Sequence, residues 1–137
     1  MIQLAYVSSA RGLLDSEDIK DILRVSRRKN RSLEITGMLL YKGGNILQIL
    51  EGDRPKVEDL YEVIRKDPRH KDVLKLYEKE VCERDFPEWN MGFSDLGVED
   101  TKKLEGFSEI LDPGFDMHQL KPSAAAELLK VFKTGMR

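Results

Sequence analysis

The sequence has few of the residues that bind metals, form disulfides or cross membranes. It contains one cysteine, Cys82, and two histidines, His70 and His118, in 137 residues. A single cysteine excludes an intramolecular disulfide and a cysteine-based zinc site, and two histidines do not make a convincing metal site. No apolar run approaches the roughly 20 residues of a membrane-spanning helix. We therefore expect a protein without a metal or a membrane anchor, in the reducing environment of the cytoplasm.

An excess of charge of one sign is also missing. The chain has 23 Lys and Arg against 25 Asp and Glu, which gives a formal net charge of −2. Without a basic excess, nucleic acid is not an expected partner. A strand pattern begins at the first residues, so no signal peptide is expected. The length of 137 residues suits one domain.

The usual catalytic motifs are absent as well. The sequence has no GxGxxG or Walker-type loop, and no HExxH, GxSxG or CxxC. A hydrolase needs a nucleophile and a base within reach of each other, and with so few histidines no good pair is visible. We therefore do not expect an enzyme, and a small hydrolase is kept only as an alternative.

A β-hairpin occupies the centre of the sequence. The apolar runs Met38–Tyr41 and Ile46–Leu50 flank Gly43-Gly44, and adjacent glycines supply the positive φ angles of a two-residue turn. Both runs are apolar on successive residues, so we expect the hairpin to be covered on both faces of its sheet.

One polar residue interrupts the second run of this hairpin. Gln48 shares a face with Ile46 and Leu50, and a two-residue turn places it opposite Leu39. A buried amide costs free energy unless its donors and acceptors are satisfied. Gln48 is therefore the first candidate for a functional residue.

The remaining elements follow from apolar periodicity and from turn residues. We expect a strand at Met1–Ser9, a helix from Ser16 to about Asn30, and a second helix that Asp53 caps and Asp67-Pro68 stops. We also expect an exposed strand at Val73–Cys82 and a short last strand that carries Trp89, Met91 and Phe93 and lies beside the strand of Gln48. The order β-α-β-β-α-β-β predicts an α+β fold, a ferredoxin-like sheet with one extra strand and both helices on one face. Two C-terminal helices, Thr101–Leu111 and Ser123–Phe132, are expected to cover the other face.

Three more polar residues fall on predicted apolar faces. Tyr6 shares a face with Leu4, and Ser26 and Asn30 continue the apolar stripe of the first helix. Each has an ordinary structural explanation: a core tyrosine, a hydroxyl bonded to its own helix, and an asparagine that ends the helix. From the residues alone, a flavin-free interaction domain of ferredoxin-like fold stays open as an alternative.

Seven short strings occur together and in order: LAYVSSA, DIKDIL, SRRKN, ITGMLLY, ILQILEG, DPRH and F-PEWNMGF. In this combination the chain resembles the BLUF family, the blue-light sensors that use flavin. The resemblance covers about Ile2–Leu96, and the key positions match the family spacing without an insertion: Tyr6, Asn30, Gln48, Trp89 and Met91.

The resemblance implies a role for each of these residues. Asn30 corresponds to the asparagine that binds the polar edge of the flavin ring, and Gln48 to the glutamine between that ring and Tyr6. Tyr6 corresponds to the donor of an electron and a proton to the excited flavin. Trp89 and Met91 correspond to a pair whose arrangement is coupled to output.

The resemblance also implies further contacts to the cofactor, which would be FAD or FMN. Family positions that line the flavin or its ribityl chain are Ser26, Asp67, Arg69 and His70, and Lys29 would reach the ribityl or phosphate end. A flat apolar ring with one polar edge also needs aliphatic walls. The inward faces of the two helices offer Ile22, Leu23 and Ile64.

The chain is accordingly expected to be a blue-light photoreceptor with two parts. Residues 1–96 would form the flavin-binding domain, and residues 97–137 a helical cap whose position changes when Gln48 rearranges. The cap has an apolar stripe, Ala125, Leu128, Leu129 and Phe132, which would favour a homo-oligomer or a downstream protein partner.

Overall fold

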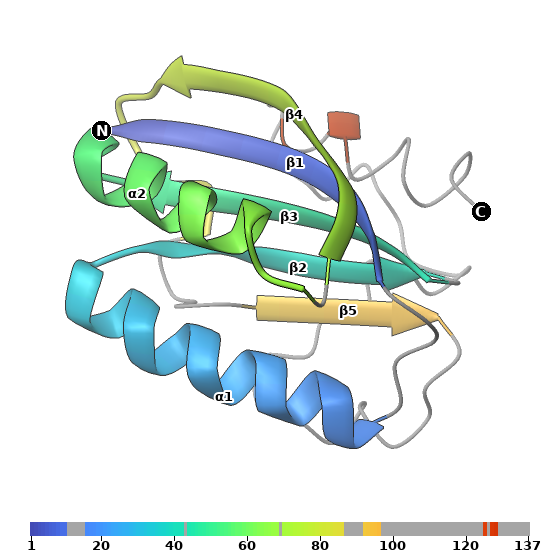
Figure 1. Ribbon diagram of the computed structural model, residues 1–137. Coiled ribbons are helices and arrows are strands. Elements are labelled where there is room, and N and C mark those ends of the chain that lie inside the picture. Colours follow the sequence, from blue (N-terminus) through green and yellow to red (C-terminus); the bar gives the residue numbers. More distant parts are fainter. Residues whose placement is uncertain are drawn as a thin grey trace.

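The computed structural model describes residues 1–10, 16–42, 44–68, 70–86, 92–96, 125 and 127–128. Its elements are β1 (Ile2–Ala10), α1 (Ser16–Leu33), β2 (Thr36–Lys42), β3 (Asn45–Gly52), α2 (Arg54–Arg65), β4 (His70–Glu80) and β5 (Gly92–Leu96). Both helices lie on the same face of one sheet (Figure 1). The predicted α+β fold is confirmed.

The sheet has five strands in the order β4-β1-β3-β2-β5. The first four pair antiparallel, as the predicted ferredoxin-like arrangement requires. β5 pairs parallel with β2, from Met38↔Gly92 to Lys42↔Leu96. The expectation that the last strand adjoins the strand of Gln48 is therefore wrong, because β2 lies between β5 and β3.

The hairpin has the predicted register. Lys42 pairs with Asn45, which leaves two residues for the turn, and Leu39 pairs with Gln48. Gly44 has a φ of 89°, a conformation that glycine adopts without steric cost. All residues of β3 after Asn45 are buried, so this strand is covered on both faces.

Two apolar clusters lie on the two faces of the sheet. The cluster on the helix side contains Ile2, Leu4, Tyr6, Ile35, Leu39, Tyr41, Ile46, Leu50, Val57, Leu60 and Tyr61. The cluster on the far side contains Ala5, Met38, Leu40, Leu47, Ile49, Phe86 and Ala125, and Leu128 packs against it. Two residues of the C-terminal segment, Ala125 and Leu128, thus contribute to the far side. The predicted helix at Thr101–Leu111 lies outside the described residues.

Helix α1 continues one turn beyond its predicted end. Glu34 follows it with a φ of 57°, its N–H donates to Arg31 O at 3.3 Å, and the N–H of Ile35 donates to Asn30 O at 2.9 Å. This pair of bonds is a Schellman motif, which usually has glycine at the position of Glu34. Asn30 is therefore not the residue that ends the helix: it belongs to the last turn.

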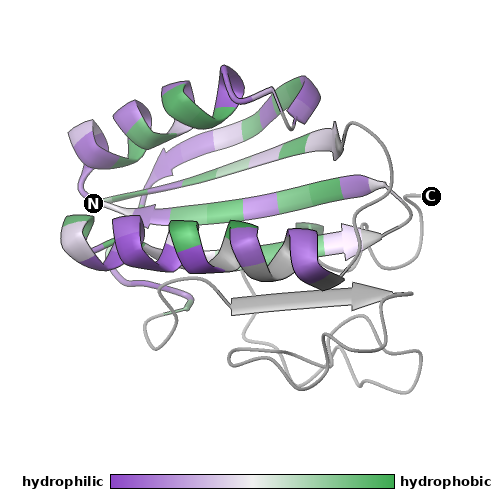
Figure 2. Ribbon diagram, turned by 60° about the horizontal axis from the view of Figure 1, so that its bottom comes forward, coloured by the Kyte–Doolittle hydropathy of each residue, from purple (hydrophilic) through white to green (hydrophobic). Residues whose placement is uncertain are grey.

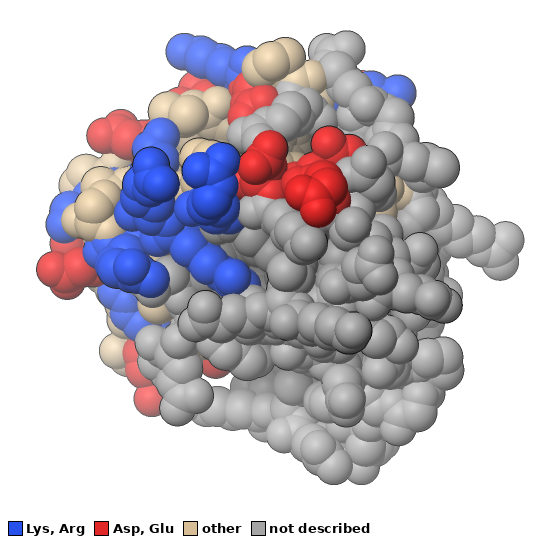
Figure 3. Space-filling view, turned by 90° about the horizontal axis from the view of Figure 1, so that it is seen from below, with Lys and Arg blue, Asp and Glu red and all other residues tan. Residues whose placement is uncertain are grey.

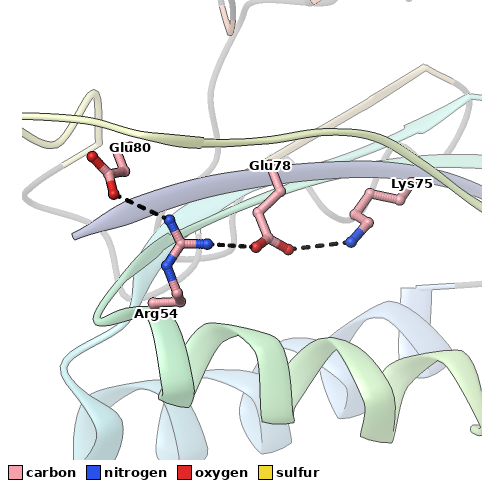
Figure 4. A network of polar contacts seen from close by, with 4 residues as sticks. All are labelled: Arg54, Lys75, Glu78 and Glu80. Atoms are coloured by element: carbon pink, nitrogen blue, oxygen red, sulfur yellow. Dashed lines mark hydrogen bonds and ion pairs between the residues drawn. The ribbon is translucent and has the colours of Figure 1, made fainter.

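Helix α2 starts as predicted but without a side-chain cap. Asp53 is the N-cap residue, its side chain makes no capping hydrogen bond, and Pro55 lies in the first turn. Arg54 instead ties the start of the helix to β4, since it lies 2.9 Å from Glu78 and 3.5 Å from Glu80 (Figure 4). Lys75 lies 3.2 Å from the same Glu78. Exposed ion pairs of this kind add little stability.

Strand β4 is the exposed edge strand, as predicted, but its bounds differ. It begins at His70 rather than Val73 and ends at Glu80, so the exposed Cys82 lies just beyond it. The ladder with β1 shifts register between Ala5 and Tyr6. An irregular edge is one way in which proteins limit pairing with other strands.

Most of the exposed side chains of α1 that the structure describes are charged, acidic near its start and basic near its end. The two helices carry both hydrophilic and hydrophobic residues along their length (Figure 2), as amphipathic helices do. Lys and Arg gather on one part of the surface seen from below (Figure 3), and the exposed basic residues of α1 are Arg24, Arg28, Lys29 and Arg31. In the described part of the chain, neither helix is apolar enough, over enough residues, to cross a membrane.

Gly37 on β2 lies so close to the backbone of β3 that a side chain at this position should lower stability. A Cβ atom on Gly37 would overlap the backbone carbonyl oxygen of Ile49, and a backbone group cannot move aside as a side chain can. We expect Gly37→Ala to lower the free energy of unfolding by about 1–3 kcal/mol. Gly52→Ala is the comparison, with a smaller expected loss, because its Cβ would make a tight contact with the backbone oxygen of Glu34 at 3.3 Å but would not overlap it. Equal urea midpoints for the two variants would contradict this expectation.

Candidate functional site

A hydrogen bond between two neighbouring strands forms the centre of the site. Tyr6 on β1 and Gln48 on β3 are register partners, and the Tyr6 hydroxyl donates to Gln48 Oε1. Tyr6 is 0% exposed and Gln48 is 5% exposed. With its oxygen held by Tyr6, Gln48 has its Nε2 hydrogens left to donate elsewhere.

The surroundings keep Tyr6 in its neutral form. Its ring lies 5.6 Å from the ring of Tyr61 on α2 and 6.2 Å from the ring of His70 on β4. Burial raises the pKa of Tyr6, and electrostatic repulsion from Tyr61 and Asp67 raises it further. At neutral pH Tyr6 is therefore a protonated hydrogen-bond donor.

Two polar contacts hold His70 in place. Its Nδ1 lies 2.8 Å from the hydroxyl oxygen of Ser8 on β1, and its backbone N–H donates to Asp67 O at 3.1 Å. Both His70 and Asp67 are half-buried. Two of the predicted cofactor contacts are thus close to the Tyr6 ring, at the connection between α2 and β4.

Helix α1 supplies a buried amide on the same side of the sheet. Asn30 is 1% exposed, and Ser26, one turn earlier, is half-buried. Ile22 from α1 and Ile64 from α2 pack against the cluster on the helix side. The inward faces of both helices therefore combine aliphatic surface with polar groups.

Other predicted site residues lie elsewhere or outside the described chain. Lys29 is exposed on α1. Leu23 lies on α1, but its side chain is not among the described ones. Arg69, Trp89 and Met91 lie outside the described residues, so their roles stay predictions.

Sequence reasoning missed two residues beside Tyr6. The sequence analysis gave no role to Tyr61 or Ser8, although Tyr61 packs on Tyr6 and Ser8 contacts His70. Ser8 shares the alternating face of Tyr6 along β1, and this spacing was the available signal. The contact of Tyr61 depends on how α2 docks, which no local pattern encodes.

A second tyrosine–glutamine pair lies on the far side of the same sheet. The Tyr77 hydroxyl on β4 donates to Gln3 Oε1 on β1. Gln3 Nε2 donates to Glu51 Oε2 at 3.1 Å and to Asp85 Oδ2 at 2.9 Å. Carboxylates only accept, so the Gln3 amide has one satisfied orientation. The Gln48 oxygen instead accepts from a neutral hydroxyl. Since a hydroxyl can donate or accept, the contact with Tyr6 does not by itself fix the orientation of the Gln48 amide.

The comparisons with known proteins identify the family. A family model described as "Sensors of blue-light using FAD" matches residues 1–92. The chain belongs to this BLUF family of flavin-binding blue-light sensors. The donor set fits such a cofactor: Asn30 and Gln48 offer buried amide donors and acceptors to a polar ring edge, and the helix faces offer aliphatic contact to the ring.

Two relatives match this chain over only a part of their own length. The "Photoactivated adenylate cyclase subunit beta" of Euglena longa is 40% identical over 89 residues, which cover 64% of this chain and 10% of that protein. The "Blue light- and temperature-regulated antirepressor BluF" of Escherichia coli is 28% identical over 131 residues, which cover 96% of this chain and 32% of that protein. The chain thus spans about a tenth of the first relative and a third of the second.

One solved structure is similar over nearly its whole length. The dark-state structure of BlrB, a BLUF protein, has a TM-score of 0.71 and 32% sequence identity. The match covers 96% of this chain and 94% of that one. The α+β arrangement described above is therefore shared with a BLUF protein of similar size.

Proposed function

We propose that this protein is a blue-light photoreceptor in which Tyr6 and Gln48 form the switch. The observation that carries the proposal is the buried hydrogen bond from the Tyr6 hydroxyl to Gln48 Oε1. The flavin supplies the absorption of blue light and accepts charge in its excited state. Tyr6 gives up an electron and its hydroxyl proton, and the proton passes through Gln48.

In this proposal the amide group of Gln48 makes the altered hydrogen-bond pattern persist after illumination. Once the electron and the proton have returned to Tyr6, the amide is left rotated or as its tautomer. An amide has a donor at one end and an acceptor at the other, so this change reverses what the ring edge receives. Two arrangements that differ by a few kcal/mol give a two-state element that light can bias.

Residues from both helices and from β4 hold the flavin in this proposal. Asn30 binds the polar edge of the ring, and Ile22 and Ile64 contact its faces. Ser26, Asp67, Arg69 and His70 line the ring or the ribityl chain, with Leu23 beside them and the exposed Lys29 near the outer end. Because these contacts are made to the ring and the ribityl chain, FAD and FMN are equally suited.

We further propose that the protein controls another protein rather than catalysing a reaction. Its relatives include a cyclase subunit named as photoactivated and an antirepressor named as regulated by blue light. Residues 97–137 would form the cap that transmits the change, through Trp89 and Met91, to a partner or to a second copy of the chain. Support for the cap comes from Ala125, which is buried in the far-side cluster.

The first test is the visible absorption spectrum before and after blue light. We expect a bound flavin whose spectrum shifts reversibly to the red. Tyr6→Phe and Gln48→Leu should retain flavin but lose the normal red-shifted state, because each removes one half of the hydrogen bond that carries the proton.

Tyr77→Phe is the matched control for this test. It removes the hydroxyl of the other tyrosine–glutamine pair, on the far side of the sheet, and should leave the red shift intact. A protein that binds no flavin, or a normal photocycle in Tyr6→Phe, would contradict the proposal.

The second test measures how tightly flavin is held. Asn30→Ala removes a buried amide from the polar ring edge, and we expect it to weaken flavin binding by about 1–3 kcal/mol. Ser32→Ala is the control, because Ser32 is exposed on the same helix and donates only to Lys29 O at 2.8 Å. Equal dissociation constants for the two variants, from equilibrium titration, would remove Asn30 from the binding site.

A further inference from the structure

A fully buried carboxylate lies at the end of β3. Glu51 is 0% exposed, although glutamate is rarely buried unless it is paired. Its Oε1 accepts hydrogen bonds from the Thr36 hydroxyl at 2.9 Å and the Phe86 N–H at 2.7 Å. Its Oε2 accepts from Gln3 Nε2 at 3.1 Å and the Asp85 N–H at 2.9 Å. Four donors thus compensate the burial of this carboxylate.

These donors come from two strands and from the chain beyond β4. Gln3 lies on β1 and Thr36 on β2, whereas Asp85 and Phe86 follow β4 and precede β5. Two of the four bonds come from backbone N–H groups, so the carboxylate fixes the path of the main chain at residues 85–86. We call Glu51 and its four donors, together with Arg84, the Glu51 clamp.

Arg84 adds three hydrogen bonds to the clamp. Its Nη1 donates to Thr36 Oγ1 at 2.8 Å and to Glu51 O at 3.0 Å. Its Nη2 donates to Glu34 O at 2.7 Å. The side chain of Arg84 and the backbone of residues 85–86 are therefore fastened to the same corner of the sheet, where β2 begins and β3 ends.

The clamp and the photoactive pair belong to the same ladder. Tyr6↔Gln48 and Gln3↔Glu51 are both register partners between β1 and β3. The two pairs are three positions apart, about 10 Å along the strands. Because three is an odd number, the two pairs lie on opposite faces of the sheet. A shift of β3 against β1 at Gln48 is thus carried by the backbone ladder to Glu51.

We propose that Glu51 is a positioning residue of the photoreceptor. It couples residues 84–86 to the β1–β3 ladder, so that a hydrogen-bond change at Gln48 on the helix side moves the main chain on the far side. The proposal rests on the proposed function, since it needs the light-driven change at Gln48. The structural change would then travel from the β1–β3 ladder to residues 84–86, which directly precede residues 87–91 in the sequence.

The test follows two signals in the same sample: the flavin red shift, and amide hydrogen exchange at Asp85 and Phe86 in the dark and under blue light. In the wild type we expect light to change exchange at these two amides severalfold. Glu51→Gln replaces one accepting oxygen by a donor, so one of the two N–H groups loses its acceptor. That variant should exchange faster in the dark and lose the light-dependent difference, while it keeps the red shift.

A matched control and a second variant make the result decisive. Glu80→Gln changes a carboxylate on β4 whose side chain is 85% exposed, and it should behave like the wild type. Thr36→Val removes a donor to Glu51 and one of the three acceptors of Arg84, and should reduce the light-dependent difference, whereas Thr36→Ser should restore it. If Glu51→Gln does not fold, the two Thr36 variants decide the question.

The outcomes separate this inference from the proposed function. A wild type without a red shift overturns the proposed function and the inference with it. A wild type that has a red shift but unchanged exchange at Asp85 and Phe86 overturns the inference alone. The inference is also overturned if Glu51→Gln keeps the wild-type light difference, or if it loses the red shift, because Glu51 would then act on the flavin site itself.

Discussion

The buried hydrogen bond between Tyr6 and Gln48 is the interaction on which the other features of the site depend. It requires the two residues to be register partners on adjacent strands, and it requires both helices to cover that face so that water does not compete. The neutral state of Tyr6 follows from the same burial, because burial is the largest cause of its raised pKa. The α+β arrangement is thus also the arrangement that keeps a protonated tyrosine beside a buried amide.

The two faces of the sheet use the same pair of residue types in different ways. On the far side, Gln3 donates to two carboxylates and accepts from Tyr77, so its orientation is locked. On the helix side, the Gln48 oxygen accepts from a neutral hydroxyl, and a hydroxyl can donate or accept. The locked pair suits a fixed attachment, whereas the pair on the helix side is the one proposed as the switch, and one antiparallel ladder joins the two.

Local patterns predicted the fold better than they predicted the far-side contacts. The hairpin at Gly43-Gly44 and the face shared by Tyr6 and Leu4 depend on neighbours in the sequence, so periodicity found them. The end of α1 was missed because Glu34 adopts a conformation typical of glycine. The position of β5 depends on tertiary pairing with β2. Glu51 was missed because a glutamate suggests a surface position, and its donors Asp85 and Phe86 lie more than thirty residues away.

The most direct test of Gln48 as the switch is the light-minus-dark infrared difference spectrum of protein with isotope-labelled glutamine side chains. If the amide of Gln48 rotates or changes tautomer, difference bands must shift with the label, and they must persist in a Gln3→Leu variant that removes the locked amide. The same bands must disappear in Gln48→Leu. A flavin red shift without any label-sensitive amide band would contradict the role of Gln48 and leave the red shift to be explained by another group.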